Sequence, residues 1–210
     1  MFVELIESLR CPRAHADSAL VAAVSRSEQR YIVEGTLGCP VCGAQFPIAN
    51  GIARFDDDVA LPSADTPSAE TAMRLAAFLE LTDARGFVLL AGRWTVHADE
   101  VRRIAETPLV LVNAPKGIRA DAAAMIEARD AVPLAPSSAR SCALDSGMSP
   151  SLVTSLVRIV RAAGRILGPV ALSVPAGVRE LVRDDHVWVA EKTAAPDQAP
   201  RLLRLERPAR

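Results

Sequence analysis

The stretch Gly86-Phe-Val-Leu-Leu-Ala-Gly-Arg-Trp-Thr-Val96 carries the most informative pattern in the chain. An apolar run of strand length ends in a glycine, and a helix-like segment follows it. An α/β nucleotide-binding domain places its first strand and phosphate turn in this way. Such a turn needs further small residues, because backbone N–H groups must approach the ligand closely. Arg93, Trp94 and Val96 stand there instead, so the stretch predicts a fold more firmly than an activity.

Composition bounds the classes of protein that this chain can belong to. Its 210 residues are 50% hydrophobic, enough for one α/β domain with a real core plus a small module. The net charge is −1, and lysine occurs only at Lys116 and Lys192. No broad electropositive surface is expected, and aromatic residues that could stack on bases make up only 4%. Charge therefore gives no indication of nucleic-acid binding.

The sequence also gives expectations about location. No window reaches the ~18 uninterrupted apolar residues that a membrane span needs. The segment from Met1 to Arg10 contains Glu4 and Glu7 and no basic region of the kind that opens a signal peptide. Three of the four cysteines lie in the first fifth of the chain, which fits a reduced compartment and a metal site better than a disulfide framework. We expect a cytoplasmic protein without membrane contact.

The chain divides into two predicted parts. Residues 1–55 form a small β-rich module, with strands expected at Ala19 to Ser25 and Arg30 to Leu37. A turn is expected at Asn50-Gly51. Residues 56–68 are rich in charge, proline and serine and are expected to be a linker. Residues 69–210 alternate between apolar strand-like runs and amphipathic helices, which predicts a mostly parallel α/β sheet.

The expected elements of the second part follow from these periodicities. Helices are predicted at Ala69 to Thr82, Ala98 to Glu106, Ile118 to Ala128 and Pro150 to Ala163. Strands are predicted at Phe87 to Ala91, Pro108 to Asn113, Ala131 to Leu134, Ser141 to Leu144 and Arg165 to Ser173, with Val187 to Glu191 and Arg201 to Glu206 as a terminal pair.

A zinc site is the chemistry that the cysteine spacing indicates. Cys39 and Cys42 form a Cys-x2-Cys knuckle, and Cys11 precedes it. Ala14 stands where a second Cys-x2-Cys would end, so His15 is the expected fourth ligand. Four protein ligands would make the zinc structural and not catalytic. The alternative is that a former ribbon keeps its cysteines as small buried residues without a metal.

The first quarter of the chain resembles the small zinc-ribbon proteins that activate methyltransferases. The resemblance rests on Leu5-Ile-Glu-Ser-Leu-Arg-Cys-Pro12, on Cys39-Pro-Val-Cys-Gly43 and on the closing Phe46-Pro-Ile-Ala-Asn-Gly-Ile52. It implies a ribbon fold with a metal and a protein partner. Ribbons of this type cover an apolar surface or extend a partner's sheet, and the partner surface here could also be satisfied by the second part of the same chain.

The rest of the chain resembles a class I S-adenosylmethionine-dependent methyltransferase domain with a Rossmann-like sheet. The segments that carry this are Phe87 to Gly92, Arg129 to Leu134 and Leu156 to Leu167. The resemblance implies that Gly92 would approach the cofactor, that Asn113 would face the ribose and that Asp130 would face the adenine amino group.

The family pattern fails at the cofactor turn. Leu90 replaces an acidic residue, and Trp94 and Val96 replace two glycines, so Trp94 would occupy the space of the cofactor. Asn113 is a neutral substitute for the acid that binds the ribose hydroxyls, and each lost hydrogen bond forfeits about 1 kcal/mol or more. The sequence therefore favours a chain that does not bind S-adenosylmethionine.

Other polar residues are isolated in the sequence. His97 and His186 have no partner at catalytic spacing, and Cys142 lies in an apolar strand. Asp145 follows the strand where such enzymes often place substrate contacts, although its context also suits a loop. We name no catalytic residue.

Two functional hypotheses remain. The preferred one is a non-catalytic, methyltransferase-like protein that serves as a protein-binding or regulatory platform. The alternative is an active methyltransferase with an atypical turn that acts on RNA or protein, with Asp130 and Asn113 holding the nucleoside. A third possibility is a Rossmann-like fold that binds another small molecule or none.

Overall fold

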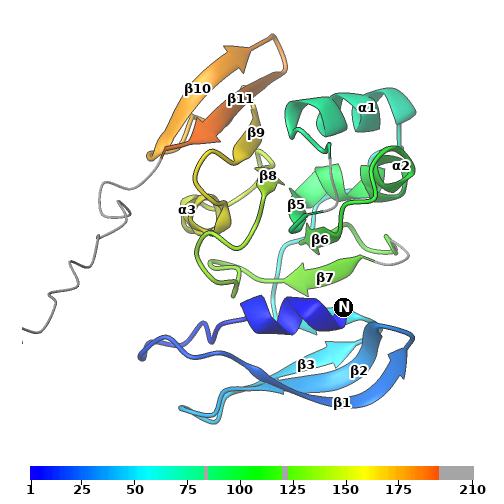
Figure 1. Ribbon diagram of the computed structural model, residues 1–210, viewed down its shortest axis with the longest axis vertical. Coiled ribbons are helices and arrows are strands. Elements are labelled where there is room, and N and C mark those ends of the chain that lie inside the picture. The colour runs from blue at the N-terminus through cyan, green and yellow to red at the C-terminus, as the bar shows by residue number, and fades with distance from the viewer. Residues whose placement is uncertain (83–84, 120–122, 194–210) are drawn as a thin grey trace, which may run out of the picture.

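The computed structural model describes residues 1–82, 85–119 and 123–193. Within them an 11-stranded mixed sheet runs in the order β1-β2-β3-β4-β7-β6-β5-β8-β9-β11-β10. Figure 1 shows the first three strands at one end of the molecule and the hairpin of β10 and β11 at the other. The sheet thus joins the two predicted parts of the chain through backbone hydrogen bonds.

The N-terminal part is a small antiparallel sheet preceded by a 3-10 helix. The helix η1 spans Val3–Ser8. The strands are β1 (Val21–Glu28), β2 (Tyr31–Gly38), β3 (Gln45–Ala49) and β4 (Ile52–Arg54). The predicted turn at Asn50-Gly51 is present, and both residues have positive φ angles of 52° and 78°. Asparagine and glycine tolerate this region better than other residues do.

The centre of the sheet is parallel. Its strands are β5 (Val88–Ala91), β6 (Leu109–Val112), β7 (Ala124–Glu127), β8 (Ser141–Ala143) and β9 (Arg165–Pro169). β11 (Val187–Lys192) pairs antiparallel with β9 and with the edge strand β10 (Val178–Arg183). The expectation of a mostly parallel sheet is therefore right for the centre, whereas both ends of the sheet are antiparallel.

β4 and β7 form the junction between the two predicted parts. They run parallel with Ile52 opposite Met125 and Arg54 opposite Glu127. The guanidinium of Arg54 donates to the Glu127 carboxylate across this pair at 2.8 Å. The ribbon-like part thereby extends the parallel sheet of its own chain.

Helices cover both faces of the central sheet (Figure 1). Residues in a strand alternate between faces. In β5, Val88 and Leu90 accordingly pack with α1 (Ala69–Phe78) and α2 (Ala98–Ile104). Leu89 and Ala91 pack on the opposite face with α3 (Pro150–Ile159) and with the apolar side chains of the N-terminal part. No helix among the described residues is long and apolar enough to cross a membrane.

Two sequence expectations need correction, and a third lies outside the described residues. The helix predicted at Ile118 to Ala128 is wrong, since residues 124–127 form strand β7. Ala123, Ala124 and Ala128 are buried in or beside this strand, and burial in the sheet overrides the helix propensity of alanine. Ala131 to Leu134 is no strand; Leu134 makes a single bridge to Leu9. Arg201 to Glu206 lies outside the described residues, and β11 instead pairs with β9 and β10.

Candidate functional site

The structure brings Cys11, His15, Cys39 and Cys42 together into one group of donors. Their ligand atoms all lie within 4.8 Å of one another, and such a group could hold a metal ion. Residues 11 and 15 come from the loop after η1, whereas residues 39 and 42 come from the turn between β2 and β3. We call these four residues the metal-ligand cluster.

The spacing of the donors fits a tetrahedral zinc ion. Zn–S bonds of about 2.3 Å and Zn–N bonds of about 2.0 Å place neighbouring sulfurs about 3.8 Å apart and a sulfur and a nitrogen about 3.5 Å apart. The Sγ atoms of Cys11 and Cys42 are 3.8 Å apart. Cys39 Sγ and His15 Nε2 are 3.4 Å apart. Both distances match edges of the expected tetrahedron, so the donor set fits zinc in geometry as well as in chemistry.

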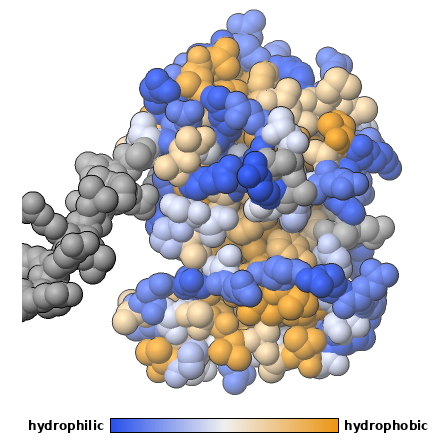
Figure 2. Space-filling view, viewed as in Figure 1, coloured by the Kyte–Doolittle hydropathy of each residue, from blue (hydrophilic) through white to orange (hydrophobic). Residues whose placement is uncertain are grey.

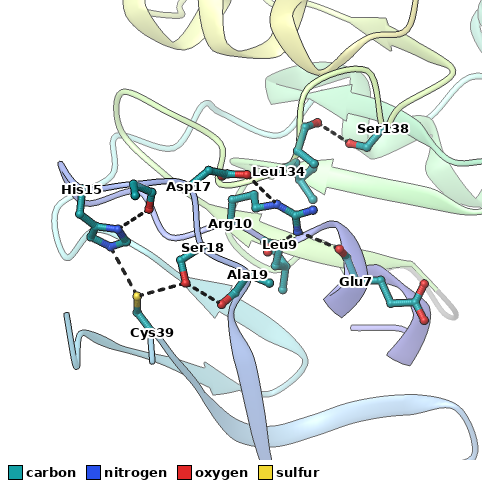
Figure 3. Close-up of polar contacts among 12 residues, drawn as sticks. Glu7, Leu9, Arg10, His15, Asp17, Ser18, Ala19, Cys39, Leu134 and Ser138 are labelled. Carbon is teal, nitrogen blue, oxygen red and sulfur yellow. Dashed lines mark hydrogen bonds and ion pairs between the residues drawn. The ribbon is translucent and has the colours of Figure 1, made fainter. Parts of the chain in front are cut away.

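A backbone contact selects the tautomer of the neutral His15 ring (Figure 3). Its Nδ1 lies 2.6 Å from the carbonyl oxygen of Ala16, and its Nε2 faces Cys39. A carbonyl only accepts, so in the neutral ring Nδ1 carries the proton and Nε2 has the lone pair. Histidine ligands of metals usually make such a second hydrogen bond, which orients the ring. His15 is therefore prepared to act as a ligand through Nε2.

The thiols of the metal-ligand cluster have shifted pKa values. Burial raises the pKa of Cys39, but hydrogen bonds from the backbone N–H groups of Cys42 and Val41 and from the two neighbouring thiols outweigh burial. They lower this pKa from 9.0 to about 6. Burial raises the pKa of Cys11 to about 11. The cluster thus holds one sulfur as a thiolate at neutral pH, and a metal would displace the protons of the others.

A second arrangement stands at the carboxyl end of β5, where the 3-10 helix η2 (Gly92–His97) begins. Gly92 has a φ of +60°, and a Cβ at this position would overlap the carboxylate of Asp145. Asp145 follows β8 and is buried. Only glycine fits here, because Asp145 lies directly against the backbone.

Asp145 is held in place by the residues that follow Gly92. Its Oδ2 accepts from the Arg93 N–H at 2.9 Å, and its Oδ1 lies 3.2 Å from the Arg93 guanidinium. The indole Nε1 of Trp94 donates to the carbonyl of Leu144 at 2.7 Å. We call Gly92, Arg93, Trp94 and Asp145 the β5 clamp. Its bonds tie the ends of two adjacent parallel strands together.

The β5 clamp lies at the point of the sheet where the direction of strand addition reverses. The sheet grows from β5 through β6 to β7 in one direction and through β8 to β9 in the other. In open α/β sheets, ligands bind outside the carboxyl ends of the strands at this point of reversal. In this chain protein side chains occupy it.

Asn113 has a structural partner. Its side chain is buried, donates to the Ala128 carbonyl at 2.8 Å and accepts from the Ala128 N–H at 2.9 Å. Its φ is +52°, a conformation that asparagine adopts more readily than most residues. Both groups of the amide thus connect the ends of β6 and β7.

Asp130 follows two residues after Ala128 and contacts α3. Its carboxylate accepts from the Ser151 hydroxyl at 2.9 Å near the start of α3. It lines a cavity together with Arg10 and Cys11, whereas Gly92 and Asn113 are not among the residues that line this cavity. The three residues predicted to hold a cofactor therefore do not share this pocket.

The remaining polar residues have different surroundings. Cys142 is fully buried in β8, and burial raises the pKa of its thiol. His97 and His186, far apart in sequence, line one cavity together with Arg93 and Trp94.

The pairing of Arg93 with Asp145 was not predicted from the sequence. The available signal was that Arg93 and Asp145 each stand two residues after an apolar strand, β5 and β8. Opposite charges at the same end of two parallel strands favour an ion pair.

Comparison with known proteins adds little. No family model matches the chain, and no curated protein matches it. Among solved structures, a geranyl diphosphate methyltransferase in complex with GPP and sinefungin is similar with a TM-score of 0.36 and 12% sequence identity. The match covers 57% of this chain, which spans 57% of that chain. A likeness of this size carries no argument about function.

Proposed function

We propose that this chain is a non-catalytic protein with a Rossmann-like, methyltransferase-like fold, which acts as a protein-binding or regulatory platform and carries a structural zinc ion. The observation that carries the proposal is the β5 clamp. Counted from β5, the parallel strands lie in the order 3-2-1-4-5, the order of dinucleotide-binding sheets. The place where such a sheet holds its ligand is filled by Asp145 and its partners.

The surroundings of the other expected cofactor contacts support the same proposal. The amide of Asn113 gives one N–H to the Ala128 carbonyl and accepts from the Ala128 N–H through its oxygen. Only its second N–H remains, and turning the amide toward a ribose would break these two buried bonds. Leaving a buried partner unpaired costs about 1–3 kcal/mol. Asp130 accepts from the Ser151 hydroxyl at the start of α3.

The proposed zinc ion would be held by Cys11, His15, Cys39 and Cys42. All four positions of a tetrahedral ion would then be protein ligands, and no position would remain for a substrate or water. When bound, the ion would cross-link the loop after η1 to the turn between β2 and β3. The three thiol ligands need a reducing compartment to stay unoxidised, which fits the cytoplasm.

An apolar surface of the N-terminal part supports the proposed role in protein binding. β1 is an edge strand. Val21 and Val24 on it are 62% and 48% exposed, and Val41 in the cysteine turn is 62% exposed. Figure 2 shows apolar residues gathered at this end of the molecule. Exposed edges with apolar side chains are a common place for protein partners to add a strand.

A titration of the zinc-loaded protein with S-adenosylmethionine and with its demethylated product tests the proposal. We expect no heat of binding at millimolar ligand, with one zinc per chain measured on the same sample. Binding with one-to-one stoichiometry that is lost in Asp130→Ala would overturn the proposal. It would support the active methyltransferase, in which Asp145 lies near the methyl acceptor.

A further inference from the structure

A cavity of about 410 Å³ lies between α1, η2 and the start of β11. It is lined from α1 by Arg74 and Phe78, from η2 by Arg93, Trp94 and His97, and from the β10–β11 turn by His186. It contains none of the residues of the metal-ligand cluster. It shares only its Arg93 and Trp94 walls with the β5 clamp.

His97 offers a hydrogen-bond donor to this cavity. The backbone N–H of Ser68 donates to His97 Nδ1 at 3.1 Å, so in the neutral ring the proton is on Nε2. Burial lowers the pKa of His97, and the charges of Asp65 and Glu100 oppose this shift. No side chain or carbonyl among residues 1–82, 85–119 and 123–193 accepts from Nε2. A ligand that enters the cavity can therefore accept from a neutral His97.

Arg74 adds a positive charge at the rim. It pairs with Asp184 at 2.7 Å, and their side chains are 46% and 41% exposed. Exposed ion pairs of this kind contribute little to stability. An anionic ligand could thus replace Asp184 as the partner of Arg74 at small cost. Asp65 also lines the cavity, and Arg93 is paired with the buried Asp145. Arg74, whose partner Asp184 is exposed, is therefore the cation that an anionic ligand would engage.

The other walls are flat and apolar. Phe78 and Trp94 each lie under an arginine, with Arg74 5.6 Å from the Phe78 ring centre and Arg93 5.3 Å from that of Trp94. Leu75, Leu167 and Val187 complete the lining. Pockets with apolar walls and a few convergent polar groups are typical of small-molecule sites.

We propose that this cavity binds a small organic anion, a carboxylate or phosphate carried on a flat apolar body. The anionic group bonds with Arg74 and His97 Nε2, and the apolar body packs between Phe78 and Trp94. The inference does not depend on the proposed function, because the cavity lies beside the β5 clamp and leaves Asp145 in place.

Benzoate, phenyl phosphate and neutral benzyl alcohol are suitable probes, with inorganic phosphate as the bare anion. The NMR signal of the Trp94 indole N–H reports on the cavity. Trp188 is an internal control, because its indole is fully buried and donates to the Leu172 carbonyl.

We expect benzoate or phenyl phosphate to shift the Trp94 signal saturably and not that of Trp188. A larger response to phenyl phosphate would indicate a phosphate ligand, and a larger response to benzoate would indicate a carboxylate. A stronger effect of benzyl alcohol, or no saturable shift with any probe, would overturn the proposal.

Two variants break the same ion pair from opposite sides. Arg74→Gln removes the proposed anion ligand, and we expect about tenfold weaker binding of the anionic probe, as loss of a charged hydrogen bond implies. Asp184→Asn keeps Arg74 and removes its competitor, so we expect equal or tighter binding. Equal weakening in both variants would mean that only the ion pair's structural role matters, and would contradict the proposal.

Discussion

Two regions of the molecule depart from the sequence patterns that they resemble, and the structure compensates for only one of them. In the metal-ligand cluster, Ala14 stands where a ribbon would have its cysteine, and His15 brings Nε2 to 3.4 Å from Cys39 Sγ instead. In the β5 clamp, Trp94 stands where a cofactor turn would have glycine, and Asp145 closes the space beside Gly92.

The difference lies in what each kind of site requires. A metal ion needs a donor atom at the right distance, and a neighbouring residue can supply one. A cofactor turn needs empty space next to the backbone, which no added side chain can supply. We therefore expect the shifted ligand to preserve the metal site and the bulky residue in the glycine turn to remove the cofactor site.

The largest expected effect is the loss of the metal. Cys39→Ser should abolish stoichiometric zinc and lower the free energy of unfolding by at least about 3 kcal/mol, since structural zinc in small modules contributes about 10 kcal/mol or more. Zinc content and urea unfolding on one sample measure both quantities.

The controls for this prediction separate the metal from ordinary packing. Cys142→Ala changes an equally buried cysteine in β8 and should leave zinc content unchanged. His15→Ala should weaken zinc affinity at least about 100-fold, beyond the usual cost of an outer-shell change. Full zinc binding in His15→Ala would mean that Nε2 is not the fourth ligand.

A methyl group at Gly92 tests how tightly the β5 clamp is closed. Gly92→Ala should lower the free energy of unfolding by about 2–4 kcal/mol, because alanine is strained at positive φ and its Cβ overlaps Asp145. In Gly92→Ala/Asp145→Ala the overlap with the carboxylate is gone, and only that with the Cβ of residue 145, 2.7 Å from the new methyl group, remains. The double variant should therefore lose less than the sum of the single losses. Additive losses in denaturant unfolding would show that the two residues are not in contact.

Asn113→Asp distinguishes a structural from a ribose-binding side chain. The aspartate cannot donate to the Ala128 carbonyl, so we expect a loss of about 1–3 kcal/mol in unfolding free energy and no gain of cofactor binding. Asn113→Ala is the matched control, since it removes both bonds without adding a charge. Unchanged stability together with new binding of S-adenosylmethionine would restore the ribose role.

The smallest expected effect is a dependence on pH at the β10–β11 turn. Hydrogen bonds from the N–H groups of Val187 and His186, and the charge of Arg74, hold the pKa of Asp184 below its ordinary value of 3.8. A carboxyl with a lowered folded pKa stabilises the fold above its unfolded pKa and loses this effect as pH falls through the folded pKa. Hydrogen exchange of the Val187 amide should therefore quicken below about pH 4 relative to the intrinsic rate. Asp184→Asn should flatten this change, and an equally steep change in the variant would assign it to another group.

Strands could be predicted from the sequence where a short apolar run lies between turn residues. β5 and β6 were predicted within one residue at each end because all of their residues are apolar and buried. β7 was predicted as a helix because the segment around it, residues 118–128, is rich in alanine, which favours helices. Its pairing with neighbouring strands cannot be seen in a local pattern. β10 was not predicted, since its exposed charged residues carry no apolar period.

The candidate sites divide in the same way. Cys11, His15, Cys39 and Cys42 were named from spacing because a metal restricts the residue types that can serve. The contact of Asp145 with Gly92 joins residues 53 positions apart, and only the register of β5 against β8 brings them together. The cavity beside α1 likewise combines residues from distant segments, so no local sequence motif could predict it.

The backbone amides of Arg93 and Ser146, both bonded to Asp145, test the central claim most directly. Their NMR signals can be followed while S-adenosylmethionine is added to the zinc-loaded protein. Because Asp145 already fills the carboxyl end of β5, we predict that neither signal moves at millimolar ligand. Saturable movement of both signals would contradict the account, since it would mean that the cofactor enters where Asp145 lies.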